Sequence, residues 1–214
     1  MSIDLYMWPF SPPSRAVLML TKELNIKTNI KIIELCVGQH LQPEYLSVSP
    51  GGLVPAIDDN GYKLWESRAI MQYLCSKYGP DTQLYPKDLE TRAEVDRWLY
   101  TDCTLFPFIR DVTFFSKFRS ILTESTISLL KDNLKLVNQL IGDKTYLVDN
   151  HLTIADLSLS ASLSFLIYYN YDLTDYPNIS RWYISLSKLL PYFEEINGFT
   201  SDEANEIVSK MQKI

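Results

Sequence analysis

The chain has 214 residues, 46% of them hydrophobic, and its 20 Lys and Arg against 26 Asp and Glu give a net charge of −6. This length and apolar content suffice for one large core or two smaller ones. The acidic balance argues against a protein that binds the phosphate backbone of nucleic acids, because such proteins carry a dominant basic surface. We therefore expect no nucleic-acid partner.

The start of the chain and its hydropathy predict a soluble, cytoplasmic protein with no membrane partner. Residues 1–4 lack the basic residues and the apolar core of a signal peptide, and no uncharged apolar run approaches about 18 residues. The three cysteines, Cys36, Cys75 and Cys103, form no Cys-x-x-Cys pair. We therefore expect neither a disulfide framework nor a metal site.

The first 79 residues alternate between strand and helix patterns. In chain order they predict a strand at 3–8, a loop at 9–13, a helix from 14, a strand at 30–35, a hairpin with strands at 54–57 and 62–65, and a helix at 67–78. The hairpin turn, Asp58-Asp59-Asn60-Gly61, has the residues that tight turns prefer, and Gly79-Pro80 is a strong helix stop.

The rest of the chain changes character. Residues 80–87 are polar and predict a linker, and from residue 88 the spacing of apolar residues is helical throughout. The predicted fold class is thus an α/β, thioredoxin-like N-terminal domain at 1–79, followed by an all-α C-terminal domain at 88–214.

Four separated segments resemble the cytosolic glutathione S-transferases, in particular the serine-type delta and epsilon classes of arthropods. They are Ser11-Pro12-Pro13-Ser14-Arg15, the stretch from Ser49 to Ile57, Glu66-Ser67-Arg68-Ala69-Ile70, and the stretch from Leu152 to Ser158. In the last segment Thr153 and Asp156 have the spacing of a helix capping box, which is a structural feature.

Ser11 is the candidate catalytic residue. A serine cannot replace the cysteines of a redox-active relative, but its hydroxyl can donate a hydrogen bond to a thiolate while the following helix N-terminus adds positive potential. Lowering a thiol pKa by about two units requires roughly 2.7 kcal/mol, within reach of these two effects. The structural alternative is that Ser11 or Ser14 caps the helix.

The resemblance assigns the thiolate to Ser11 and leaves Ser14 as the candidate helix cap. Tyr6, on the first predicted strand, is the weaker alternative of a tyrosine-dependent enzyme and is more simply a core residue.

The resemblance also implies how glutathione, the co-substrate, is held. The backbone of Val54 pairs with the cysteinyl part next to a cis Pro55, with Gly52 beside them. Where this chain has Gly51-Gly52, the delta and epsilon classes usually have Gln-His, and losing such a contact weakens binding by about 1.5 to 3 kcal/mol. His40 matches another contact to the glycyl end.

At the other end of glutathione, Ser67 is expected to bind the α-carboxylate through its hydroxyl and backbone amide, and Glu66 the α-ammonium. Arg68 is expected to fix Glu66 or to reach a subunit interface. In isolation, the same triplet is a serine helix cap flanked by solvated charges.

The second substrate is expected in an apolar pocket between the two domains. The candidate lining residues are Pro13, Leu35, Phe106, Ile109, Phe114, Phe118 and Phe199. Since most aromatic residues of a helical bundle are core residues, about half of those in the helical domain are expected to touch substrate. Asp111 either lies on a solvated face with Arg110 or reaches the pocket, where it would bind a polar group of a ligand such as a steroid.

These features predict an enzyme that conjugates glutathione to hydrophobic electrophiles in detoxification, with a peroxidase side activity, and the resemblance implies a homodimer. The alternative is a protein of the same fold that binds hydrophobic ligands, such as steroids, with little or no catalysis.

Overall fold

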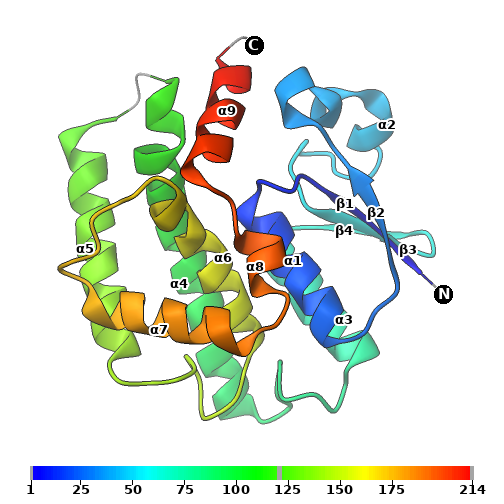
Figure 1. Cartoon of the computed structure of the whole chain (residues 1–214). Helices are drawn as coiled ribbons and strands as arrows, with labels where there is room; N and C mark the ends of the chain where they lie inside the picture. The colour runs from blue at the N-terminus through cyan, green and yellow to red at the C-terminus, as the bar shows by residue number, and fades with distance from the viewer. Residues whose placement is uncertain (1, 120–121, 213–214) are drawn as a thin grey trace.

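A four-stranded sheet lies beside a larger group of helices in the computed structural model, which describes residues 2–119 and 122–212 (Figure 1). The strands are β1 (Ile3–Met7), β2 (Thr28–Ile32), β3 (Ala56–Asp59) and β4 (Tyr62–Trp65). The helices are α1 (Pro12–Glu23), α2 (Pro43–Leu46), α3 (Ser67–Tyr78), α4 (Leu89–Thr113), α5 (Glu124–Ile141), α6 (Ile154–Tyr168), α7 (Pro177–Leu189), α8 (Phe193–Asn197) and α9 (Ser201–Met211). Short 3₁₀ turns are η1 (Leu35–Val37), η2 (Gln39–Leu41) and η3 (Phe115–Lys117).

The sheet is mixed, with strand order β2-β1-β3-β4. β1 runs parallel to β2 and antiparallel to β3, and β3 and β4 form the predicted hairpin. Asn60 and Gly61 close this hairpin with φ values of 55° and 93°, the left-handed conformation that a tight two-residue turn requires. The thioredoxin-like α/β class predicted for this part is confirmed.

Four elements have other bounds than predicted. β1 ends at Met7 instead of residue 8, and β3 spans Ala56–Asp59 instead of 54–57. The second strand begins and ends earlier, at 28–32, because residues 35–37 form the turn η1 instead. The first helix begins at Pro12, before the predicted residue 14. Proline suits the first helical positions, whose backbone N–H groups have no partner within the helix.

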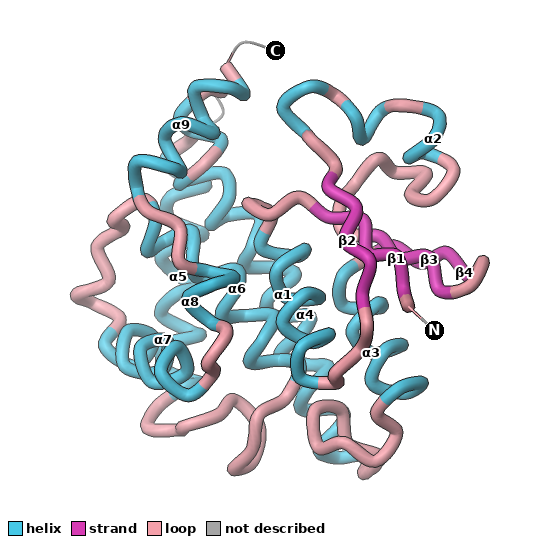
Figure 2. Tube along the Cα trace, turned by 45° about the vertical axis from the view of Figure 1, so that its right-hand side comes forward, coloured by secondary structure: helices cyan, strands magenta, loops and turns pink. Residues whose placement is uncertain are grey.

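The two faces of the sheet pack against different elements (Figure 2). Ile3, Leu5 and Met7 alternate along β1 and point into the main core, which includes α1 and α3. Tyr6 points to the opposite face, where its ring packs on Tyr45 of α2 at 6.0 Å between centroids. The period of two along a strand thus places Tyr6 on the face away from α1.

The all-α class predicted for the rest of the chain is also confirmed. α6 is buried along nearly its whole length and packs against both α1 and α4. Its N-terminus is fixed by Asp156, whose carboxylate accepts hydrogen bonds from the backbone N–H and the hydroxyl of Thr153, both at 2.9 Å. The other carboxylate oxygen accepts from the N–H of Leu147 at 2.8 Å, so one side chain holds the helix start and the preceding loop together.

A buried arginine connects the two parts of the chain. Arg15 of α1 donates to the carbonyl of Phe10 at 2.8 Å, to Ser164 of α6 at 2.6 Å and to the side chain of Asn197 at 3.0 Å. Its guanidinium also lies over the ring of Phe199 at 5.4 Å. The loop before α1 is therefore bonded, through one side chain, to α6 and to the end of α8.

A buried carboxylate fastens the hairpin to α3. Asp59 is 2% exposed and accepts hydrogen bonds from Tyr73 and Lys77 at 2.7 Å and from Tyr78 at 2.8 Å. Burial acts to raise the pKa of Asp59, but the hydrogen bonds from Lys77, Tyr73 and Tyr78 outweigh it and hold the pKa well below its usual range.

This carboxylate makes stability sensitive to acid. A group whose pKa is lowered by folding stabilises the protein above its unfolded pKa of about 3.9 and loses that contribution as the pH falls through its folded pKa. We expect the free energy of unfolding, from urea titrations, to fall between about pH 5 and about pH 3, and to fall less in Asp59→Asn. The control Asp132→Asn, at an exposed ion pair with Lys135, should keep the wild-type slope. An unchanged slope in Asp59→Asn would exclude this role.

Candidate functional site

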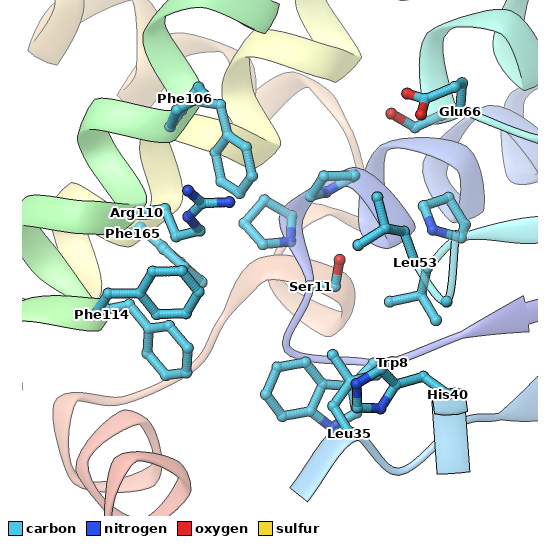
Figure 3. A pocket seen from close by; sticks show the side chains of 18 of the residues that line it. Trp8, Ser11, Leu35, His40, Leu53, Glu66, Phe106, Arg110, Phe114 and Phe165 are labelled. Atoms are coloured by element: carbon cyan, nitrogen blue, oxygen red, sulfur yellow. The ribbon is translucent and has the colours of Figure 1, made fainter. Parts of the chain in front are cut away.

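A cleft of about 460 Å³ lies where the sheet domain meets the helices. Figure 3 shows Ser11 near its centre, with aromatic side chains of the helical part on one side and Leu53, His40 and Glu66 on the other. The lining residues are Trp8, Ser11, Pro12, Pro13, Leu35, His40, Gly52, Leu53, Val54, Pro55, Glu66, Ser67, Arg68, Cys103, Phe106, Pro107, Arg110, Phe114, Phe115, Arg119, Phe165 and Met211.

Ser11 occupies the N-cap position of α1 but does not act as a side-chain cap. Its φ and ψ of −75° and 116° are those of a capping residue, yet its hydroxyl makes no capping hydrogen bond. The backbone is fixed instead, because its N–H donates to the carbonyl of Trp8 at 2.9 Å and its own carbonyl accepts from Arg15 at 3.0 Å. The hydroxyl, at a residue only 9% exposed, is left for a ligand in the cleft.

Neither alternative hydroxyl faces the cleft. Ser14 lies inside α1, fully buried, and its hydroxyl has no hydrogen-bond partner among the described residues, so its prediction as the helix cap is wrong. Tyr6 lies on the far face of the sheet against Tyr45 and is absent from the lining.

The loop before β3 presents free backbone to the cleft. The Val54–Pro55 peptide bond is cis, as predicted. The preceding carbonyl, of Leu53, accepts hydrogen bonds from the Tyr45 hydroxyl at 2.6 Å and from Ser49 at 2.9 Å, which fixes the loop from below. Within the described part of the chain, the N–H and carbonyl of Val54 have no hydrogen-bond partner. They are thus available to an extended peptide-like ligand.

Gly52 and His40 are close neighbours in this loop region. Gly52 has φ of 62°, and a Cβ there would approach the His40 carbonyl to 3.0 Å, so a side chain at this position would be strained and crowded. The His40 Nδ1 is buried and has no partner among the described residues. Burial lowers the pKa of His40, so at neutral pH the ring offers a hydrogen bond rather than a full charge.

The start of α3 lines the same side of the cleft as the loop before β3. Glu66 has φ of 70°, a left-handed conformation rare outside glycine, and its exposed side chain borders the cleft. Ser67 is the first residue of α3, where backbone N–H groups have no partner within the helix. The site therefore combines a carboxylate with a hydroxyl and free amides, a set suited to the two charges of an amino-acid end.

Arg68 connects Ser67 to the helical part. It donates to the Ser67 hydroxyl at 3.3 Å and forms a short hydrogen-bonded ion pair with Asp102 of α4. Asp102 is fully buried and also accepts from Ser158 of α6 at 2.5 Å. The contact of Arg68 is thus with Ser67 and Asp102 rather than with Glu66.

The other half of the cleft is mainly apolar. Four of the predicted lining residues lie there: Pro13, Leu35, Phe106 and Phe114. Sequence reasoning missed Trp8, Phe115, Phe165 and Met211, which complete the wall. Trp8 directly precedes the Ser11 loop, a signal that was present in the sequence, but Phe165 and Met211 reach the cleft only through the packing of α6 and α9.

Three predicted lining residues lie outside the cleft. Ile109 is fully buried in the core, because it projects from the side of α4 that packs inward. Phe118 packs edge-to-face on Phe114 at 5.0 Å, behind the cleft wall. Phe199 covers the guanidinium of Arg15 and packs edge-to-face on Phe10 at 5.3 Å.

The steroid hypothesis required the Asp111 side chain to reach the pocket, and the structure places Arg110 there instead. Asp111 is absent from the lining, and its carboxylate is paired with Arg110 at 2.9 Å. Arg110 borders the cleft instead (Figure 3).

Comparisons with known proteins identify the family. Residues 5–82 match the family model of the glutathione S-transferase N-terminal domain, and residues 123–185 match that of the C-terminal domain. Glutathione S-transferase D7 of Drosophila melanogaster is 34% identical over 91% of this chain and 88% of its own length.

Two solved structures are similar over nearly the whole chain. A delta-class glutathione transferase of Nilaparvata lugens is 37% identical, with a TM-score of 0.86 and 99% of each chain covered. A glutathione transferase homologue of Drosophila mojavensis, solved with bound glutathione, is 33% identical, with a TM-score of 0.84 and coverage of 99% of this chain and 97% of its own. This chain therefore belongs to the glutathione S-transferase family.

Proposed function

We propose that this chain is a cytoplasmic enzyme that conjugates reduced glutathione to hydrophobic electrophiles, with Ser11 stabilising the glutathione thiolate. The observation that carries the proposal is the Ser11 hydroxyl, which lies in the cleft and makes no capping hydrogen bond. No feature of the cleft favours a non-catalytic ligand-binding role.

The position of Ser11 supports thiolate formation for two reasons. Its hydroxyl donates a charge-assisted hydrogen bond, and it lies at the N-terminus of the 12-residue helix α1, whose dipole favours negative charge. A free thiol with pKa of about 8.5 is only a few per cent ionised at neutral pH. Together the two effects raise the thiolate fraction, while the thiol proton leaves to solvent.

The rest of the cleft accounts for the two substrates. The free backbone of Val54 suits the cysteinyl part of glutathione, Glu66 and Ser67 the γ-glutamyl end, and His40 the glycyl end. The apolar half then holds the electrophile beside the sulfur, so that proximity adds to thiol ionisation. The sulfur attacks an electrophilic carbon, and either a leaving group departs with its electron pair or the electrons of a double bond move to a conjugated carbonyl.

Replacing Ser11 with alanine tests this assignment. We expect kcat with 1-chloro-2,4-dinitrobenzene to fall at least tenfold at pH 6.5 to 7, roughly the value of one charge-assisted hydrogen bond, while calorimetric affinity for glutathione stays within about threefold. The pH at which turnover is half-maximal should move upward. Ser14→Ala is the matched control and should keep the wild-type pH profile. Unchanged turnover in Ser11→Ala would exclude the role of Ser11, and no binding at millimolar glutathione would exclude the function.

The Arg68–Asp102 pair is proposed to position Ser67. In Asp102→Asn the size of the side chain is kept but its charge is lost, so Arg68 is held less firmly and we expect the KM for glutathione to rise about tenfold, with a smaller change in kcat. A folded variant, checked by thermal melting, with wild-type KM would contradict this role. Asp96→Asn is the control, because Asp96 lies on the same helix and bonds Gln72 and Tyr85 away from the cleft.

We further propose a homodimer in which the first domain of one subunit contacts the helical domain of the other. Exposed aromatic or aliphatic side chains on β4 and α4 support it: Tyr62, Trp65, Leu89 and Tyr100. Sedimentation equilibrium should give twice the chain mass of 24.8 kDa. Tyr100→Asp should weaken the dimer, whereas Ile184→Asp, at an exposed residue of α7, should not. A wild-type mass of one chain at micromolar concentration would exclude the dimer.

A further inference from the structure

The apolar half of the cleft carries positive charge. Among the charged residues that line the cleft, Glu66 and Arg68 belong to the proposed glutathione half, and Arg68 is paired with Asp102. The remaining two, Arg110 and Arg119, border the wall that is otherwise formed by aromatic side chains. An electrophile that was wholly apolar would leave Arg119 without an acidic partner and Arg110 paired only with Asp111.

Arg110 is held in place but has donors left over. Its Nε and Nη2 both donate to the same oxygen of Asp111, at 3.0 and 2.9 Å, and its guanidinium lies over the Phe115 ring at 4.6 Å. The Nη1 group makes no hydrogen bond to any described residue. Figure 3 shows the guanidinium directed into the cavity, near Phe106. The side chain is 36% exposed and lines the cleft, so an acceptor in the cleft can reach the free Nη1 group.

Arg119 adds a second charge at the same ring. Its guanidinium lies 4.3 Å from the centroid of Phe115, and no ion pair joins it to another described residue. Both arginines thus stack on the ring of Phe115, and Asp111 neutralises the charge of Arg110 only. Stacking on an aromatic ring orients a guanidinium while leaving its N–H groups free to bind an anion.

We propose that the electrophile conjugated by this enzyme is an aromatic or aliphatic molecule that carries a carboxylate, which Arg110 and Arg119 bind while Phe106 and Phe114 cover the apolar part. The inference rests on the proposed function, because it names the class of molecule that enters the same cleft. The carboxylate accepts from the free Nη1 donors of Arg110 and is attracted by the charge of Arg119.

A matched pair of probes separates charge from shape. Ethacrynic acid and its methyl ester carry the same α,β-unsaturated ketone and differ only in the carboxylate. In both, the thiolate sulfur forms a bond to the terminal alkene carbon, the double-bond electrons move to the ketone oxygen, and the enolate takes a proton from solvent. Nothing is oxidised or reduced, so the ratio of kcat/KM for acid over ester reports recognition of the carboxylate.

We expect wild-type protein to prefer the acid, and Arg110→Gln to lower the acid-to-ester ratio about tenfold, the value of one charge-assisted hydrogen bond at a partly exposed site. Arg119→Gln should lower the ratio less, and the double variant more than either. Added salt should reduce the wild-type ratio, because it screens exposed charges. The control is Arg97→Gln, since Arg97 is also on α4 and paired with an acidic neighbour, Glu94, but does not line the cleft.

Three results would overturn the inference. The first is an acid-to-ester ratio at or below one in the wild-type protein, and the second is a ratio that stays unchanged in the double variant. The third is a glutathione KM that rises equally with both electrophiles in the arginine variants, which would assign the arginines to glutathione binding. If the proposed function itself is wrong, the protein turns over neither the two probes nor 1-chloro-2,4-dinitrobenzene. In that case the saturated analogues of the acid and the ester, titrated by calorimetry, still decide whether Arg110 binds a carboxylate.

Discussion

The guanidinium of Arg15 is the contact on which the geometry of the cleft depends. It is buried, and its hydrogen-bond partners are neutral groups: the carbonyls of Pro9, Phe10 and Ala161, the hydroxyl of Ser164 and the side-chain amide of Asn197. A buried charge is unfavourable unless its donors are satisfied, and here they are satisfied from both parts of the chain at once. The carbonyl of Phe10 immediately precedes Ser11. The helical part therefore does more than form one wall of the cleft, because it also fixes the loop that presents the Ser11 hydroxyl to the cleft.

The two halves of the cleft differ in the kind of group that lines them. The proposed glutathione half consists largely of backbone and helix ends, at Val54 and at the start of α3, and these groups have fixed geometry once the sheet has formed. The proposed electrophile half consists largely of side chains, from α4, α6 and α9 and from Trp8, Pro13 and Leu35 of the first domain, and side chains tolerate substitution without a change of fold. A division of this kind is consistent with one constant substrate and one variable substrate. The Arg68–Asp102 pair joins the two halves. Arg68, at the start of α3, bonds both the Ser67 hydroxyl and the buried carboxylate of Asp102 in the middle of α4.

Most of the fold, and the residues that line the proposed glutathione half of the cleft, could be predicted from sequence, because local signals coincide there. The turn at Asn60-Gly61, the helix at 67–78 and the cis bond before Pro55 each follow from residues adjacent in the chain. The electrophile half was less predictable, since the side of a helix that faces a cleft depends on how whole helices pack. Ile109 and Phe114 both lie in or just after α4, yet the first is in the core and only the second lines the cleft. The same limit applies to Arg110 and Asp111, neighbours in sequence of which only the arginine borders the cavity.

The close approach of Gly52 to the His40 carbonyl couples the conformations of the two segments that carry these residues. At Gly52 the φ of 62° strains any residue with a side chain, and a Cβ 3.0 Å from the His40 carbonyl fits only if that carbonyl moves away. A histidine introduced at position 52 alone would crowd the turn that carries His40. A side chain at position 52 therefore requires the 38–42 turn and the 49–55 loop to shift together, so the conformation of one segment limits the residues that the other can carry.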